Sequence, residues 1–203
     1  MVRDEVIPLF ASPLMVCSYD RDYKKELAWI KKQKYHSGGR NEQSEDTFIL
    51  DNKELKKIRT FFETKLNKFA TKVLQCTNKF VITQSWLNRA GKGRSHHTHK
   101  HFNSIISGVW YPYTHEKLPP IQFYRDKNET IEVNVSSYNH FNNESFLFPA
   151  KSGELLLFPS SMRHGVLPNK YDEQRISLSF NTWVKGDLGD VSRLTSLPFD
   201  RLI

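Results

Sequence analysis

A cluster of histidines is the feature of the sequence best suited to carry chemistry. His96, His97, His99 and His101 fall within six residues. Because side chains of a strand alternate between its two faces, His97, His99 and His101 are expected to share one face, with His96 on the other. Imidazole nitrogens bind iron, copper, nickel and zinc. The run therefore offers a metal ion two ligands, either His97 with His99 or His99 with His101.

Two imidazoles are too few for a tight site, so a third ligand must come from elsewhere in the chain. His164 is the best candidate, because it follows an expected strand that ends in Phe-Pro-Ser-Ser and it precedes Gly165. The sequence predicts a metal site at His97, His99 and His164. The plain alternative is a group of surface histidines that bind metal only adventitiously.

A polar strand face begins at Arg175, eleven residues after His164. Residues 175–181 alternate cleanly, which places Arg175 and Ser177 on one face and apolar side chains on the other. The arginine fork matches a carboxylate, and the serine hydroxyl adds a donor. This pair would hold the far carboxylate of a small diacid, unless the strand simply faces solvent. With the histidines, it indicates an iron site with an acidic cosubstrate.

These residues are arranged as in a known superfamily. The stretches that carry the resemblance are residues 84–88, 97–99, 107–111, 153–160 and 175–181, together with His164. In their order and spacing the chain resembles the iron(II)/2-oxoglutarate-dependent oxygenases. It looks closest to a group with prolyl-hydroxylase-like folds that is common in marine bacteria and their phages. The resemblance spans roughly residues 80–183, about half of the chain.

The resemblance implies a mainly β fold, a double-stranded β-helix or jelly-roll with flanking helices. It implies Fe(II) and 2-oxoglutarate as cofactors and hydroxylation of a C–H bond in a peptide, an amino acid or another small molecule. His97 would be the first iron ligand and His164 the distal one. Arg175 would pair with the distal carboxylate of 2-oxoglutarate and Ser177 would assist. No catalytic side chain is implied beyond the metal ligands.

Position 99 departs from the superfamily's usual pattern. The common facial triad is His-X-Asp/Glu with a distant histidine, whereas here residue 99 is a histidine. The site is then either a three-histidine centre, or it is completed by Asp126 or by water. Three neutral imidazoles leave the iron with its full charge of +2, whereas a carboxylate would cancel one unit.

Four further side chains are candidates for the pocket wall. They are Trp86, Asn88, Trp110 and Tyr111. Asn88 and Tyr111 are expected to help bind the cosubstrate. For the aromatic residues, packing in the core is the competing interpretation.

The surrounding pattern predicts how these residues are positioned. Apolar residues at steps of three and four predict an amphipathic helix over residues 52–76, and a shorter helix is expected over 21–35. From residue 80 onward short strands follow closely, which favours an antiparallel sandwich or barrel. We expect one domain, 1–203. It comprises a strand and helical support layer (1–78), a jelly-roll core (79–184) and a C-terminal tail (185–203).

Composition limits the class of protein and its partners. A content of 38% apolar residues is enough for a core, which argues against disorder. The net charge of +8 comes largely from lysines on the expected helices, and no RNA- or DNA-binding motif accompanies it, so nucleic acid is not favoured as a partner. No signal peptide or membrane span is expected. A cytoplasmic protein with a small-molecule or peptide substrate is predicted (in the host cytoplasm if the protein is viral), and the sequence sets no oligomeric state.

Three rival interpretations remain. The first is a metal-binding jelly-roll module without turnover. The second is a nucleic-acid-binding protein that uses the basic helices. The third is a dioxygenase with a three-histidine iron centre and no cosubstrate, which would not need Arg175 and Ser177.

Overall fold

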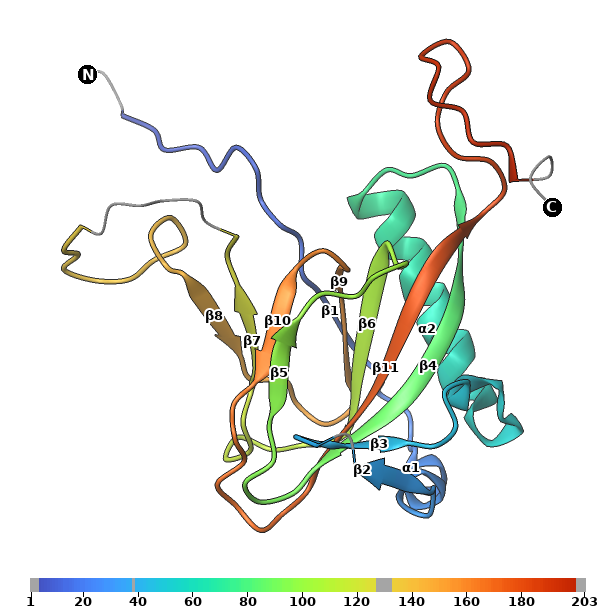
Figure 1. The fold of residues 1–203 in the computed structure, drawn as a ribbon, viewed down its shortest axis with the longest axis vertical. Helices are drawn as coiled ribbons and strands as arrows, with labels where there is room; N and C mark the ends of the chain where they lie inside the picture. Colours follow the sequence, from blue (N-terminus) through green and yellow to red (C-terminus); the bar gives the residue numbers. More distant parts are fainter. Residues whose placement is uncertain (1–3, 38, 127–132, 200–203) are drawn as a thin grey trace.

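The computed structural model describes residues 4–37, 39–126 and 133–199, which form two antiparallel sheets with helices on one side (Figure 1). The strands are β1 (Met15–Ser18), β2 (Tyr35–Ser37), β3 (Glu42–Ser44), β4 (Lys79–Ala90), β5 (His96–His99), β6 (Ile106–Tyr113), β7 (Ile121–Tyr124), β8 (Ser145–Phe148), β9 (Glu154–Pro159), β10 (Arg163–Val166) and β11 (Arg175–Lys185). The helices are α1 (Lys24–Lys31) and α2 (Lys56–Lys68), with short helical turns at Ile49–Asp51, Lys53–Leu55 and Phe69–Val73.

The two sheets have different sizes. The larger one has the order β1-β9-β6-β11-β4-β3-β2, and the smaller one has the order β5-β10-β7-β8. Neighbouring strands pair antiparallel in both. The expectation of a mainly β protein with flanking helices is confirmed.

A helical layer covers one face of the larger sheet. Ile58, Phe62 and Leu66 of α2 are fully buried, and their spacing of four residues defines one side of the helix. They join the same core as Trp110 and Leu178 of the sheet. The predicted amphipathic helix is therefore present, although a 3₁₀ turn precedes α2 and a π-helical turn follows it.

A second, smaller core lies between the two sheets. Val109 and Tyr111 contribute to it from β6, whereas Trp110 between them points toward the helices. Phe158 of β9 and Phe123 of β7 meet there with ring centroids 5.0 Å apart. Strand alternation thus divides each central strand between a helix-facing core and the interior of the sandwich.

The alternation of side chains along β11 determines where Arg175 and Ser177 lie. Ile176, Leu178 and Phe180 belong to the helix-facing core. Arg175 and Ser177 must therefore point to the opposite face, into the interior between the sheets, where both are buried. The polar face predicted for residues 175–181 is an internal wall of the sandwich, not a solvent-exposed surface.

Other predicted elements differ from the structure. The helix expected over residues 21–35 is limited to α1, Lys24–Lys31, and the strand expected in 1–78 includes β1, of which four residues pair with β9. The alternating residues 131–135 also predict a strand, but 131 and 132 lie outside the described part of the chain, and 133–135 are not in a strand. The strands β2, β3, β8 and β10 have three or four residues each, too few for a recognisable alternation.

The domain division expected from the sequence stays a prediction. The helical segment is not separate from the sheet, since β1, β2 and β3 all join the larger one. Within the described residues, no helix combines the length and the apolar character needed to cross a membrane.

Candidate metal centre and anion site

The pairing of β5 with β10 positions the histidine cluster. His99 lies opposite His164, and His96 lies opposite Val166, so three steps along β5 match two along β10. An extra residue of this kind is a β-bulge, and it breaks the alternation of side chains. As a result, the His96 and His99 rings lie 4.5 Å apart, and His97 is exposed.

Gly165 allows the two strands to come this close. A methyl group at this position would lie 3.1 Å from the carbonyl oxygen of His96 and 3.2 Å from the backbone of Thr98. Such contacts are tighter than most that a Cβ atom makes, and the neighbours are backbone atoms, which would have to shift. The missing side chain therefore lets β5 approach β10.

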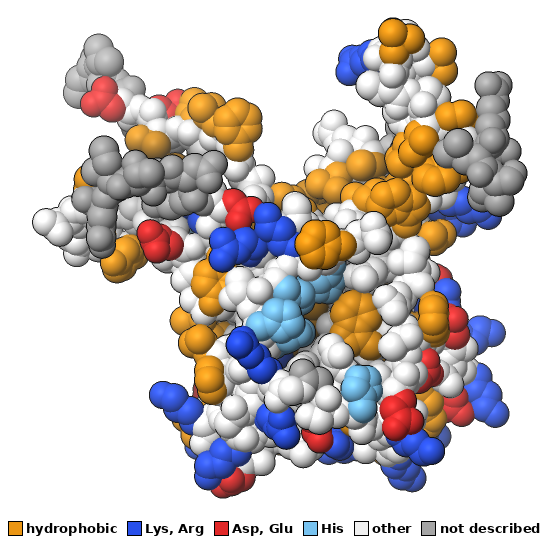
Figure 2. Space-filling model, viewed as in Figure 1, with side chains coloured by type: hydrophobic (Ala, Val, Ile, Leu, Met, Phe, Trp, Pro, Cys, Tyr) orange, Lys and Arg blue, Asp and Glu red, His pale blue; other side chains and the backbone are white. Residues whose placement is uncertain are grey.

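Three imidazoles converge at this point. His99, His101 and His164 each offer a ring nitrogen, and these atoms all lie within 4.8 Å of one another. His99 is on β5, His101 follows that strand and His164 is on β10. In the space-filling view, histidine side chains gather near the centre of one face, with basic side chains beside them (Figure 2).

The hydrogen bonds of the three rings define which nitrogen is free. Nδ1 of His99 donates to the carbonyl oxygen of His97 at 2.8 Å, and Nδ1 of His164 donates to that of Met162 at 3.0 Å. Nδ1 of His101 donates to Oδ1 of Asn181 at 2.6 Å. A neutral imidazole with a proton on Nδ1 carries a lone pair on Nε2. All three rings therefore present an Nε2 lone pair.

The spacing of these lone pairs suits a cation. Nε2 of His99 lies 3.2 Å from Nε2 of His101. Two nitrogens bound at right angles to a metal about 2.1 Å away would be about 3.0 Å apart. Two lone pairs facing each other at this distance repel, and a metal ion between them removes the repulsion. The arrangement fits a metal ion.

Burial keeps the three rings neutral. It lowers the pKa of His164 to about 3 and that of His101 to about 4, and it lowers the pKa of His99 as well. Only a neutral imidazole can bind a metal, so the buried site favours the form that ligation requires. His96 has a similarly buried ring, whose pKa burial lowers to about 3.

The structure brings together only two of the three ligands that the sequence predicts. The structure brings His99 and His164 together, but the third imidazole is His101 and not His97. His97 lies at the exposed edge of the group: its ring centroid is 5.0 Å from that of His99, but it contributes no nitrogen to the converging set. Asp126 is not in the histidine group. Its carboxylate is more than half exposed and pairs with Lys100 at 2.9 Å and with Arg163 at 3.6 Å.

A second polar group lies within the sandwich at Arg175. This side chain is 6% exposed, and its guanidinium carbon lies 4.7 Å from the centre of the Tyr111 ring. Among the described residues, the guanidinium forms no ion pair, and the buried Tyr111 hydroxyl has no partner apart from this guanidinium. Burial raises the pKa of Tyr111, with the charge of Arg175 acting in the opposite direction, so the phenol stays protonated.

A buried cation without a counter-charge is costly, and both this guanidinium and the neighbouring Tyr111 hydroxyl could donate to an anion. Together they fit a carboxylate. Ser177 is buried two residues along the same face of β11 and offers a hydroxyl. Arg175 and Tyr111 also line a cavity of about 80 Å³.

The remaining pocket candidates lie in different surroundings. Asn88 is already engaged, since it donates to Ser179 Oγ at 3.2 Å and accepts from Asn41 at 3.0 Å. Trp110 packs in the helix-facing core. Trp86 lies near the site, with its ring centroid 5.6 Å from that of His101.

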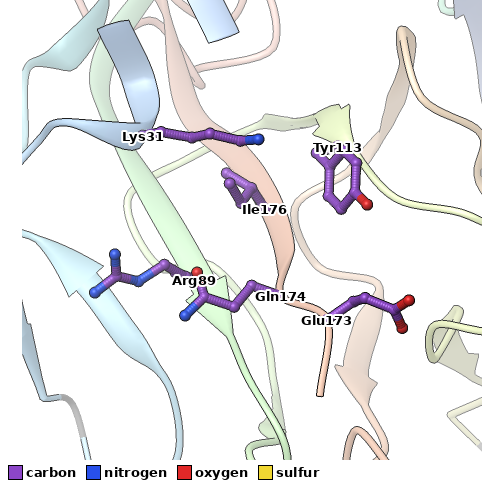
Figure 3. A pocket seen from close by; sticks show the side chains of 6 residues that line it. All are labelled: Lys31, Arg89, Tyr113, Glu173, Gln174 and Ile176. Atoms are coloured by element: carbon purple, nitrogen blue, oxygen red, sulfur yellow. The ribbon is translucent and has the colours of Figure 1, made fainter. Parts of the chain in front are cut away.

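A larger cavity of about 310 Å³ lies on a different face (Figure 3). It is lined by Lys31, Arg89, Tyr113, Glu173, Gln174 and Ile176. Ile176 is on the helix-facing side of β11, opposite to Arg175, so this cavity does not open onto the histidines.

The comparisons with known proteins agree with this geometry. Residues 84–181 match the model of a family described as "Putative 2OG-Fe(II) oxygenase". This span runs from β4 to β11 and includes all three convergent histidines and Arg175. A comparison with curated proteins found no match.

Solved structures of the same fold class are similar over most of the chain. HygX from Streptomyces hygroscopicus, with nickel, 2-oxoglutarate and hygromycin B bound, has a TM-score of 0.62 at 10% identity, covering 84% of this chain and 82% of that one. A prolyl-4-hydroxylase from Pseudomonas putida has a TM-score of 0.59 at 12% identity, covering 86% and 92%. The viral collagen prolyl hydroxylase of Paramecium Bursaria Chlorella virus-1 has a TM-score of 0.52 at 12% identity, covering 83% and 94%.

At these identities the likeness establishes the fold, and the jelly-roll expected from the sequence is confirmed. The fold and the site together define a jelly-roll protein with a histidine metal centre. Residues 84–181, which carry the whole site, also match the 2OG-Fe(II) oxygenase family, so the chain is similar to these oxygenases in both its fold and its site residues.

Proposed function

We propose that the protein is an Fe(II)- and 2-oxoglutarate-dependent oxygenase that hydroxylates a C–H bond of a peptide, an amino acid or another small molecule. One observation carries the proposal: three converging Nε2 lone pairs share the interior of the sandwich with a buried guanidinium that has no counter-charge among the described residues. A metal ion would bind the three lone pairs, and a diacid would supply the counter-charge that the guanidinium lacks. When bound, iron and 2-oxoglutarate supply the activation of dioxygen that oxidises the substrate.

The chain's own residues hold and shield these groups. His99, His101 and His164 bind the iron through Nε2, and their Nδ1 protons keep the rings oriented. Arg175 binds the distal carboxylate of the cosubstrate, with the Tyr111 hydroxyl as a second donor. In this buried setting a charge pair is stronger than in water.

The unpaired guanidinium favours this function over the two metal-only alternatives. A binding module or a cosubstrate-free dioxygenase gains nothing from a buried cation, which lowers the stability of the fold. The prolyl hydroxylases among the similar structures support hydroxylation, and the substrate classes remain those that the sequence indicates.

An anaerobic titration of the full chain with Fe(II), with and without 2-oxoglutarate, tests the proposal. We expect a weak visible charge-transfer band only when both are present. Replacing His99, His101 or His164 by Ala should weaken iron binding at least tenfold, whereas His97→Ala, the matched exposed imidazole, should leave it unchanged. Succinate release under oxygen provides the readout of turnover.

Two results would contradict the proposal. If His97→Ala weakens iron binding as much as His101→Ala, the assigned ligand set is wrong. If iron binds but 2-oxoglutarate neither binds nor yields succinate with any substrate tried, the protein is a metal-binding module.

A further inference from the structure

His101 differs from the other two converging histidines in the origin of its Nδ1 partner. His99 and His164 donate to carbonyl oxygens only two residues away in their own segments. His101 instead donates to a side chain on another strand, Oδ1 of Asn181, eighty residues further along. It is therefore the one ring of the three whose orientation depends on a distant side chain.

A chain of hydroxyl groups fixes the direction of this hydrogen bond. Ser107 Oγ lies 3.0 Å from Nδ1 of His101 and 2.8 Å from Ser160 Oγ. Ser160 donates to Ser104 at 2.8 Å, and Ser104 donates to the carbonyl oxygen of Ile106 at 3.2 Å. Because that carbonyl can only accept, each hydroxyl donates onward along the chain.

Ser107 therefore has no proton left for His101 and can only accept from it. This places the proton on Nδ1 of His101 independently of the orientation of the Asn181 amide. Ser107 and Ser160 are fully buried, so the hydroxyl chain is shielded from water. It leaves Nε2 of His101 free for the metal.

Every partner of His101 in this network is uncharged. An amide oxygen accepts the Nδ1 proton without removing it, so the ring stays a neutral ligand. A carboxylate at the same position would draw the proton and make the ring more basic, as in carboxylate–histidine–metal triads. With three neutral rings and a neutral amide, the centre keeps the +2 charge of the ion.

We propose that Asn181 is a positioning residue that orients His101 and keeps it neutral, so that the metal centre retains the charge needed to bind a dianionic cosubstrate. The inference rests on the proposed function of the histidine site. Asn181 stands on the same face of β11 as Arg175, so one strand contributes both the cation for the distal carboxylate and the partner of the metal ligand.

Two substitutions at Asn181 separate orientation from charge. Asn181→Leu removes the amide acceptor and leaves Ser107 as the remaining partner of Nδ1, and we expect metal affinity to fall about 10- to 100-fold, the range for loss of an outer partner of a ligating histidine. Asn181→Asp keeps the acceptor and adds a negative charge. We expect metal affinity to rise, and the affinity of the metal-loaded protein for 2-oxoglutarate to fall about tenfold or more, because like charges repel across a buried site.

The measurements use the full chain with Co(II) and Ni(II). Co(II) titration followed by its visible d–d bands gives metal affinity, and calorimetry of the Ni(II)-loaded protein gives 2-oxoglutarate affinity. Asn169→Asp is the matched control, since Asn169 is a buried asparagine that donates to the carbonyl oxygens of Ala90 and Glu173 and hydrogen-bonds no histidine. The Co(II) bands should shift in Asn181→Asp and stay unchanged in Asn169→Asp.

Three outcomes are distinguishable. Opposite changes in metal and 2-oxoglutarate affinity in Asn181→Asp support the proposal. Equal changes in the Asn181→Asp and Asn169→Asp variants, or wild-type metal affinity in Asn181→Leu, overturn it while leaving the proposed function intact. A wild-type protein that binds neither Co(II) nor Ni(II) would overturn the proposed function itself.

Discussion

Replacing Arg175 by methionine should affect stability and cosubstrate binding in opposite directions. In the ligand-free protein Arg175 is 6% exposed as a whole residue and has no counter-charge among the described residues. An unpaired buried ion costs several kcal/mol, of which its position over the Tyr111 ring recovers about 0.5–2 kcal/mol. Methionine fills a similar space without charge. We therefore expect the variant to be more stable than the wild type by about 1–3 kcal/mol, a rise in Tm of about 3–10 °C.

The effect on 2-oxoglutarate should be a large loss. Removing one partner of a buried charge pair costs about 2–5 kcal/mol, which corresponds to about 30- to 5,000-fold in affinity. Thermal unfolding of the Ni(II)-loaded protein measures both quantities. At a 2-oxoglutarate concentration about 100 times its Kd, the wild type should gain about 2.7 kcal/mol, and the variant should gain almost nothing.

Arg89 provides the matched control for this experiment. It stacks on the Tyr35 ring at 4.2 Å, as Arg175 does on Tyr111, but it also pairs with Glu42 at 2.7 Å. Arg89→Met should destabilise the protein and leave the 2-oxoglutarate shift intact. The reasoning is refuted if Arg175→Met lowers the Tm as Arg89→Met does and still shows the cosubstrate shift.

Three further perturbations probe the metal centre. Gly165→Ala should separate the strands that hold His99 and His164, so we expect a loss of about 1–3 kcal/mol in stability and weaker Ni(II) binding, measured by unfolding and calorimetry. Burial holds the pKa of His164 at about 3 and that of His101 at about 4, below the ordinary 6.5, so the unfolded chain takes up protons before the folded chain as the pH falls. The free energy of unfolding of the metal-free protein should therefore be highest above about pH 6.5 and decrease toward pH 4, as measured by denaturant titrations. Asp126→Asn should leave Ni(II) affinity unchanged and alter stability by less than about 1 kcal/mol, because its ion pairs are exposed; a clear loss of metal would make Asp126 a ligand.

Patterns of apolar residues that extend over many positions predict the strands and helices of the structure well. The alternation of residues 175–181 fixes which side chains enter the sandwich, and the steps of three and four over residues 52–76 fix the buried face of α2. Both signals repeat several times, so a single irregular residue does not hide them. The buried position of Arg175 follows from this alternation once the helices are known to cover the other face.

Side-chain alternation does not identify the third member of the histidine group. Alternation allows His99 to pair with either His97 or His101, and the bulge that decides between them depends on how β5 meets a strand of only four residues, β10. The one local signal is Gly165, whose missing side chain permits the close approach. A glycine directly after His164 indicates a tight strand contact there, but only the partner strand shows which histidine it brings inward.

The bulge in β5 also gives this segment an unusual redundancy. With the extra residue in place, His96 lies beside the converging group, and His97 is outside. If a deletion removed the bulge, simple alternation would put His97 in that place and leave His99 and His101 still facing inward. An imidazole would then stand next to the metal ligands in either register. A one-residue deletion in the histidine-rich run would thus leave an imidazole beside the metal ligands.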